Sequence, residues 1–383
     1  MKHNEYFINL YRGEFNLSGL QVLQLYRFPL RKLASYVVAE CSLPTNLLNA
    51  LQELLIDHEV NNLQFNLEIC HIQNKEKVPL VTCNLLLVHM DVDVTLIDKP
   101  ETNSVRMYFV PWHVYEMQQN SKLFTIYENM SALDAIKDIL NKMKSEYNLK
   151  AVKLFTKDAS NFVYEQILAR ADNDLVLPVR IADMYKPAHT QPIYFVDFFH
   201  YEESTPKPSV FFFTLFSRDL FPTKNVLTTS LSLTSRRLKS VPLHEFLKGN
   251  HYVDLLRDKP KITVKTPDMI FQQPNKQEAK NNQELVIHTP DSKIDALKRF
   301  DQTKELVLKK LHSFSWWEIR NYDFEMLTLC QRINIDIADP DSFNQLIVGL
   351  KNVFRRAAQT ADPEKIPYNH DYYILTCDYV SDS

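Results

Sequence analysis

Two acidic residues in a predicted strand have a spacing that could support acid–base chemistry. Asp91 and Asp93 alternate with Val92 and Val94, so both carboxylates project from one strand face, about 6 to 7 Å apart by the rise of a strand. A pair of carboxylates at such a separation suits a hydrolase. Acids that alternate with valines are also typical of a strand face turned to water. We favour that interpretation and expect Asp91 and Asp93 to be solvated.

A third carboxylate, Asp197, lies inside the apolar run IYFVDFF (residues 193–199). Burial of a carboxyl group favours its neutral form, which would make Asp197 a candidate general acid. The same position is explained as well by an arginine partner, or by the edge of a strand. A hydrolase that acts through Asp197, or through Asp91 and Asp93, is therefore an alternative to a purely structural role.

The histidines do not form a recognisable metal site. His244 and Glu245 begin a zincin-like pair, but position 248 is a lysine, so the second histidine of that motif is missing. His71, near Cys70 and Cys83, and His89, beside Asp91, would both need further ligands from distant positions. We expect no bound metal and no cofactor.

Nucleotide chemistry is disfavoured by the glycine content, which is only 4 in 383 residues. A P-loop or a dinucleotide fingerprint needs clustered glycines so that the backbone can approach the phosphates. Gly13, Gly19, Gly249 and Gly349 form no such cluster, and there is no G-x-S-x-G element around a serine nucleophile. The sequence therefore offers no catalytic residue that we would assign.

Short basic and aromatic clusters are better explained by interfaces or solvated faces than by nucleic-acid binding, which would need more basic residues with stacking aromatics alongside. Trp316 and Trp317 could anchor a subunit contact or simply lie in the core. The basic clusters are Arg236, Arg237 and Lys239, and Lys351, Arg355 and Arg356.

The net charge, the apolar runs and the cysteines limit the partners and the cellular compartment that the sequence suggests. The formal charge is -3, with 44 basic and 47 acidic residues, so no overall field attracts nucleic acid or an anionic membrane. The apolar runs are shorter than the ~20 residues of a membrane span. The 5 cysteines are odd in number and have no CxxC spacing. With no signal peptide in view, they indicate reduced thiols and synthesis in a cytoplasm.

The first ~120 residues are predicted to be mainly strands, because apolar residues recur there at every second position. Leu63, Phe65, Leu67 and Ile69 show this period. Further strands are predicted over residues 80–98 and 104–118, and one helix within residues 43–60, with Thr45 as its cap. Residues 1–120 are thus predicted to form an antiparallel β domain with one helical excursion.

Helices and strands alternate between residues 121 and 205, which predicts a small α/β domain. Ser131 followed by Asp134 is a helix start, so we expect a helix over residues 132–146. A second helix is predicted over residues 161–173, and strands over 151–156, 175–184 and 192–199.

Strand patterns return from residue 206 to the end, interrupted by a segment of different composition. Residues 260–292 are rich in Lys, Gln, Asn and Pro, which indicates an extended arm or linker. A helix is predicted over residues 295–312, followed by strands that include the closing DYYILTCDYV (residues 371–380). The chain is thus predicted to be α+β and mostly β.

The order of these elements resembles the baseplate hub family of contractile-tailed bacteriophages, which is shared with contractile injection systems. The resemblance lies in the order of the predicted elements, and it covers most of the chain. It is carried by SVRMYFVPWHVYEMQ (104–118), YENMSALDAIKDILNKM (127–143), SNFVYEQILARADNDLVLPVRI (160–181) and DYYILTCDYV (371–380).

The resemblance implies two barrel-like antiparallel β domains, residues 1–120 and 206–383, with the small α/β domain of residues 121–205 between them. It also implies a non-enzymatic homotrimer in the virion tail baseplate, which joins the six-fold tail tube to the central spike and lines the channel. Partners would be tail tube proteins, the spike, and tape measure and baseplate wedge proteins. Another baseplate or tail-completion scaffold protein is the alternative.

Overall fold

The computed structural model describes residues 5–13, 15–17, 19–29, 32–56, 63–73, 76–93, 102–155, 163–185, 192–202, 205–206, 208–214, 226–229, 235–241, 261–265, 284–288, 314–320, 323–325, 327–335, 344–357 and 367–378. Within these residues, no helix is long and apolar enough to cross a membrane.

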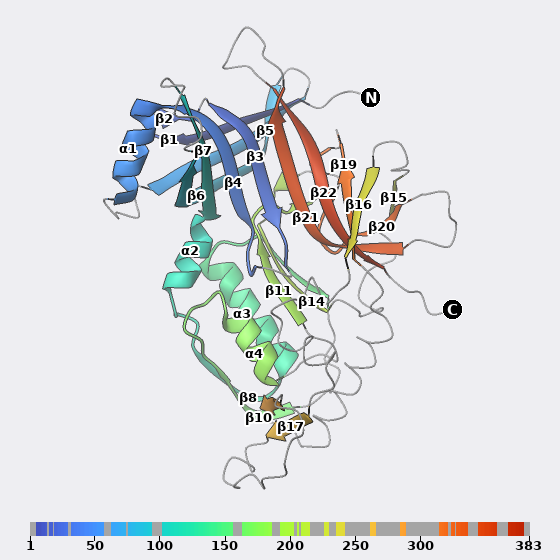
Figure 1. The fold of residues 1–383 in the computed structure, drawn as a ribbon. Helices are drawn as coiled ribbons and strands as arrows, with labels where there is room; N and C mark the ends of the chain where they lie inside the picture. Colours follow the sequence, from blue (N-terminus) through green and yellow to red (C-terminus); the bar gives the residue numbers. More distant parts are fainter. Residues whose placement is uncertain are drawn as a thin grey trace.

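Thirteen strands of the described chain form one large sheet, in which segments from both ends of the sequence lie side by side (Figure 1). From the first third come β1 (Tyr6–Arg12), β2 (Phe15–Asn16), β3 (Leu20–Arg27), β4 (Tyr36–Pro44), β5 (Gln64–Gln73), β6 (Glu76–Val92) and β7 (Thr102–Pro111). From the C-terminal part come β15 (Val226–Thr229), β16 (Ser235–Val241), β19 (Phe314–Ile319), β20 (Arg332–Ile335), β21 (Asn344–Arg356) and β22 (Tyr368–Asp378).

Eight of these strands are bonded in a ring. The order runs β21, β3, β4, β7, β6, β5, β1 and β22, every neighbouring pair is antiparallel, and β22 pairs again with β21. The link between β1 and β22 rests on the single pair Tyr6↔Tyr368. The prediction of a mostly β chain is confirmed. The division into two barrel-like domains, residues 1–120 and 206–383, with a small α/β domain at 121–205 between them, stays a prediction.

The core of the large sheet follows the period-two pattern of the sequence. Phe65, Leu67 and Ile69 on β5 are buried, as the alternation predicts. The helix expected near residue 45 is present as α1 (Thr45–Ile56), and it buries Leu48 and Leu51 against the same core. Large-sheet strands from the first third of the chain therefore share one hydrophobic core with residues near its C-terminus, such as Phe354.

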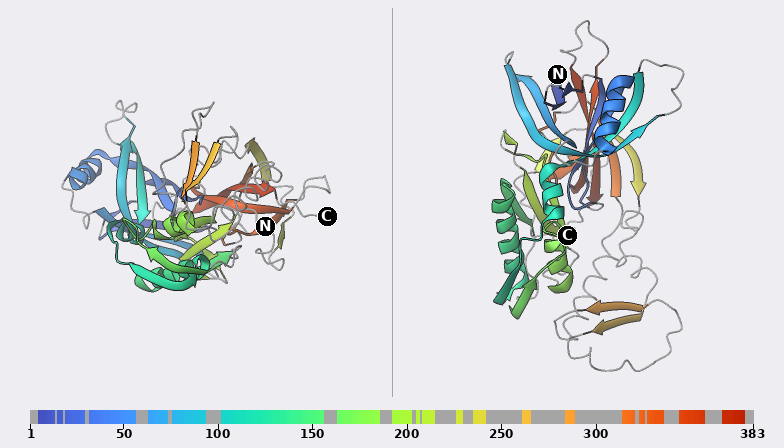
Figure 2. Two further views of the ribbon diagram at one scale, coloured as in Figure 1. Left: turned by 90° about the horizontal axis from the view of Figure 1, so that it is seen from below. Right: turned by 90° about the vertical axis from the view of Figure 1, so that its left-hand side faces the viewer.

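Most of the described part of residues 121–214, which we call the interposed module, lies below the large sheet in the view of Figure 1 and in the right-hand view of Figure 2. Its described strands are β8 (Thr125–Ser131), β9 (Ala151–Phe155), β10 (Val163–Ala169), β11 (Pro192–Asp197), β12 (Tyr201–Glu202), β13 (Thr205–Pro206) and β14 (Ser209–Thr214). Strand β14 pairs antiparallel with β11 and parallel with β9, while β8 and β10 form a separate two-stranded ribbon. Helices α3 (Ala132–Glu146) and α4 (Leu177–Tyr185) share a core with these strands.

Helix α3 begins and ends where the sequence predicts. The Ser131 hydroxyl accepts a hydrogen bond from the backbone N–H of Asp134 at 3.1 Å, which satisfies one of the amide groups that a helix start leaves unpaired. We expect Ser131→Ala to lower the free energy of unfolding by about 1 kcal/mol. Denaturant titration of this variant beside Ser131→Asp, which keeps an acceptor, would test the cap, and equal losses in both variants would contradict it.

Two predicted elements are wrong in type, and a third is correct in type but too long. Residues 161–173 were expected to be helical, but residues 163–169 form strand β10, because Val163–Ala169 pair in register with β8. Residues 175–184 were expected to be a strand, but α4 occupies 177–185 and buries Leu177, Ile181 and Tyr185, which recur every four residues. Finally, the predicted strand 104–118 ends at Pro111, and α2 (Trp112–Gln119) follows.

The predicted arm of residues 260–292 contains two short strands, β17 (Lys261–Lys265) and β18 (Glu284–His288), which pair parallel to one another. The helix predicted over residues 295–312 lies outside the described residues.

Candidate functional site

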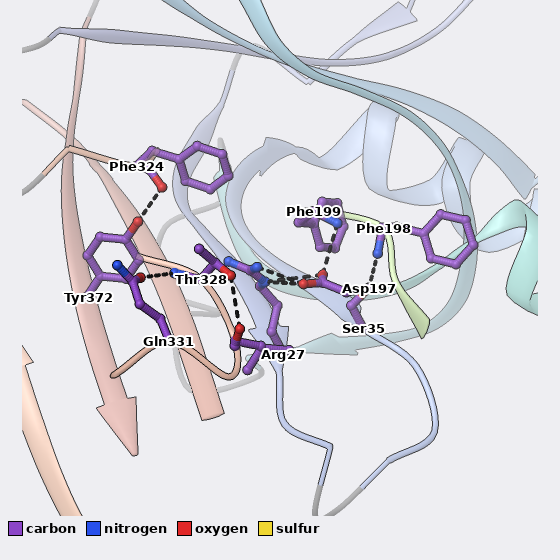
Figure 3. Close-up of polar contacts among 10 residues, drawn as sticks. Arg27, Ser35, Asp197, Phe198, Phe199, Phe324, Thr328, Gln331 and Tyr372 are labelled. Carbon is purple, nitrogen blue, oxygen red and sulfur yellow. Dashed lines mark hydrogen bonds and ion pairs between the residues drawn. The ribbon is translucent and has the colours of Figure 1, made fainter. Parts of the chain in front are cut away.

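Asp197, at the end of β11, is a fully buried charged group of the described chain (Figure 3). Its carboxylate faces the guanidinium of Arg27, which ends β3 in the large sheet. Arg27 Nε donates to Oδ1 at 3.1 Å and to Oδ2 at 2.9 Å, and Nη2 donates to Oδ2 at 2.7 Å. The two side chains are 1% and 0% exposed. Of the alternatives left open for Asp197, pairing with an arginine is the one confirmed.

The backbone around this ion pair joins the interposed module to the large sheet. The Val196 N–H donates to the carbonyl of Leu33 at 2.9 Å, and the Ser35 N–H donates to the carbonyl of Val196 at 3.0 Å. The Ser35 hydroxyl then accepts from the N–H of Phe198 at 3.1 Å. Residues 33–35 therefore act as a short parallel strand beside β11, bridged at Ala34↔Val196.

This geometry is suited to holding two parts of the chain together rather than to acid catalysis. Oδ1 of Asp197 also accepts a hydrogen bond from the Phe199 N–H at 3.0 Å, so both carboxylate oxygens already have donors. A general acid must lie within reach of a substrate atom, whereas this carboxylate is enclosed. A charged pair removed from water is stable only when its hydrogen bonds are completed in this way.

A second group of contacts fixes residues 323–325 against the core of the large sheet. The Phe324 ring is buried there with Phe354 and His370, at centroid distances of 5.7 and 5.6 Å. Its N–H donates to the Tyr6 hydroxyl at 3.0 Å, and its carbonyl accepts from the Tyr372 hydroxyl. Burial raises the pKa of Tyr372, so that hydroxyl keeps its proton and stays a donor.

The carboxylates of the predicted pair are solvated, as expected. Asp91 and Asp93 are exposed on β6 and just after it. Asp91 accepts from His89 Nε2 at 2.7 Å, and this hydrogen bond holds the pKa of Asp91 below its usual value. The pair therefore lies on an open strand face.

The candidate metal residues do not converge. Nδ1 of His71 lies 3.1 Å from Oε1 of Glu325, so its nearest acidic group comes from the 323–325 segment. Within the described residues, no group of three or more His, Cys, Asp or Glu could hold a metal ion. Burial raises the pKa of Cys41 to about 12, which keeps this thiol protonated. His244 and Glu245 lie outside the described residues.

The side chains of Lys351 and Arg355, in the C-terminal basic cluster, already contact neighbouring residues of the sheet. Lys351 Nζ lies over the rings of Tyr26 and Tyr373, 4.8 and 5.6 Å from their centroids, and Arg355 pairs with Asp371. Arg236, Arg237 and Lys239 lie on β16, where the structure describes the backbone only.

The tryptophans divide between two environments. Trp317 is buried and donates from Nε1 to Thr376 Oγ1 at 3.1 Å, so core burial is the confirmed alternative for it. Trp316 packs edge-on against Phe28 at 5.2 Å.

Arg27 is not singled out by any motif, although it shares the feature that marks Asp197. Both are charged residues within apolar strands, LQVLQLYRF and IYFVDFF. Two isolated opposite charges in separate apolar strands form a testable pairing hypothesis, because buried charges need partners. The 323–325 segment carries no comparable signal.

No protein-family model and no curated protein matches this sequence. Solved structures do match. The 43 kDa tail protein of prophage MuSo2 from Shewanella oneidensis aligns over 98% of this chain and 98% of its own, with a TM-score of 0.53 and 11% identity. A tail protein from Neisseria meningitidis MC58 aligns over 98% and 97%, with a TM-score of 0.53 and 8% identity. The chain therefore shares the fold of these tail proteins.

Proposed function

We propose that this chain is a structural component of a phage tail baseplate, and specifically the trimeric hub that joins the six-fold tail tube to the central spike and lines the channel. The observation that carries the proposal is the fold likeness to two tail proteins over 98% of this chain. An end-to-end likeness includes both the large sheet and the interposed module, so it concerns the whole architecture. The resemblance in element order to baseplate hubs supports the finer assignment.

The work of such a hub is mechanical and non-enzymatic. A hub transmits load between ring-shaped partners, so its parts must keep their relative positions. The Arg27–Asp197 ion pair and the hydrogen bonds of residues 33–35 supply this rigidity at the joint between the interposed module and the large sheet. In this proposal the partners are copies of the chain, tail tube proteins, the spike, and tape measure and wedge proteins in the virion tail.

Native mass spectrometry of the purified chain tests the trimer. We expect a mass of three copies, or a multiple of three, because the proposed hub is a three-fold ring in which each copy faces two subunits of the six-fold tube. A monomer or a simple dimer at every concentration would contradict the trimeric hub.

Cryo-electron microscopy of the intact tail tests the location. We expect three copies in a ring on the tail axis, between tube and spike. Copies placed off the axis would assign the chain to another baseplate or tail-completion scaffold instead.

A further inference from the structure

The ribbon formed by β8 and β10 exposes large apolar side chains on one face. Ile126 and Leu168 are direct cross-strand partners, and they are 53% and 46% exposed, with Phe124 beside them at 56%. Figure 1 places the β8 and β10 labels at the end of the interposed module away from the large sheet. Exposed apolar side chains that lie together mark an interaction surface more often than single scattered ones do.

The opposite face of the ribbon is already used. Tyr127, Ile167 and Ala169 are buried in the core that includes α3. One face of the ribbon is therefore fixed by packing against this core. The other face carries Phe124, Ile126 and Leu168, which we call the outer row.

Two opposite charges flank the Ile126–Leu168 pair of the outer row, one on each side. Alternation along the strands puts Glu128 beyond Ile126 on β8 and Arg170 beyond Leu168 after β10, and both are exposed. Because β8 and β10 are antiparallel, these residues lie on opposite sides of the Ile126–Leu168 pair, Glu128 opposite Gln166 and Arg170 just past the end of the ladder. Among the described residues neither has an ion-pair partner, whereas nearby Lys142 is paired with Asp138.

We propose that the outer row is a contact surface for a second copy of this chain, related by a two-fold axis that runs across the ribbon. Such an axis turns the ribbon end for end, so Ile126 meets its own copy and Leu168 meets its own copy. Arg170 is then offset sideways by one strand spacing, ~4.8 Å, from the partner's Glu128, across the ~10 Å that separates two packed ribbons, a gap that these two long side chains can span. The Ile126–Leu168 pair and the charges on either side of it are thus self-complementary, as an isologous interface requires.

The surface is small, so pairing through it is weak and depends on concentration. It is independent of the trimeric hub. If the chain is a trimer, the ribbons join trimers in pairs and double the mass, and if the chain is otherwise a monomer, they produce a dimer.

The test compares the mass of the wild-type chain with that of Ile126→Glu by sedimentation velocity over a concentration series. We expect the wild type to reach twice the mass of the variant at high concentration, because a carboxylate at the centre of the outer row would be buried against its own copy. Ile56→Glu is the matched control. Ile56 is 71% exposed on α1, far from the ribbon in sequence, and its variant should pair like the wild type.

A charge exchange separates specific pairing from general stickiness. Arg170→Glu should weaken association, and Arg170→Glu combined with Glu128→Arg should restore it, with unchanged thermal unfolding in each case. Equal masses for the wild type and Ile126→Glu at every concentration, or no restoration by the double exchange, would overturn the ribbon contact. A doubling of the mass tests the ribbon contact, whereas a mass of three copies tests the hub, so either proposal can fail without the other.

Discussion

Asp197→Ala should lower the free energy of unfolding by about 3–5 kcal/mol, because it removes one member of a buried ion pair and leaves the Arg27 guanidinium without its counter-charge. Both side chains are essentially closed to solvent, and three hydrogen bonds from Arg27 end on this carboxylate. Chemical denaturation followed by tryptophan fluorescence would measure the loss. Hydrogen exchange should also rise at residues 33–35, whose backbone is bonded to β11.

Two further variants show whether the charge itself is responsible. Asp91→Ala is the matched control, because Asp91 is an exposed aspartate on a strand, and we expect no measurable change in the free energy of unfolding. The double variant Arg27→Met with Asp197→Leu should recover much of the stability lost by Asp197→Ala, since apolar groups of similar volume can replace a buried pair. An Asp197→Ala variant as stable as Asp91→Ala would refute the structural role of the pair.

Phe324→Ala should cost about 3–5 kcal/mol, the range for removing a large buried aromatic side chain. The ring lies in the core of the large sheet against both Phe354 and His370, and its loss leaves a cavity there. We expect a lower midpoint of denaturation, measured by circular dichroism, with the assembly contacts of the folded protein unchanged.

The matched control is Phe124→Ala, which removes the same side chain from an exposed position. We expect Phe124→Ala to lower the free energy of unfolding by less than about 0.5 kcal/mol, although it should weaken the pairing of ribbons. Similar losses from both variants would show that Phe324 is not a core residue. A second variant, Tyr372→Phe, deletes only the hydroxyl that donates to the Phe324 carbonyl, and we expect about 1 kcal/mol.

Local sequence signals predict elements correctly where neighbours along the chain supply the stabilising contacts. Helix α3 is the clearest case, because the Ser131 cap and the apolar stripe that includes Ile136 and Leu140 are complete within one segment. Strand β5 is similar, since its alternation of buried and half-buried residues follows the alternation of apolar and polar residues in the sequence. The exposure of Asp91 followed from the same alternation.

Where the partner is remote, local pattern misleads. Residues 163–169 resemble a helix in isolation, but pairing with β8, some forty residues earlier in the sequence, makes them a strand. In α4, Leu177, Ile181 and Tyr185 recur at helical spacing, whereas the β-branched and apolar content of the same segment favours a strand. Propensity is a weak guide once tertiary contacts compete with it.

By itself, the sequence determined that the chain is mostly β, that nucleotide-binding glycine loops are missing, and that Asp197 is an unusual charge in an apolar strand. Only the tertiary structure decided that Arg27 is its partner, 170 positions away, and that β21 and β22 bond with β3 and β1 in the ring of the large sheet. The physical reason is that composition and periodicity report which side chains must leave water. They do not report which distant segment will cover them.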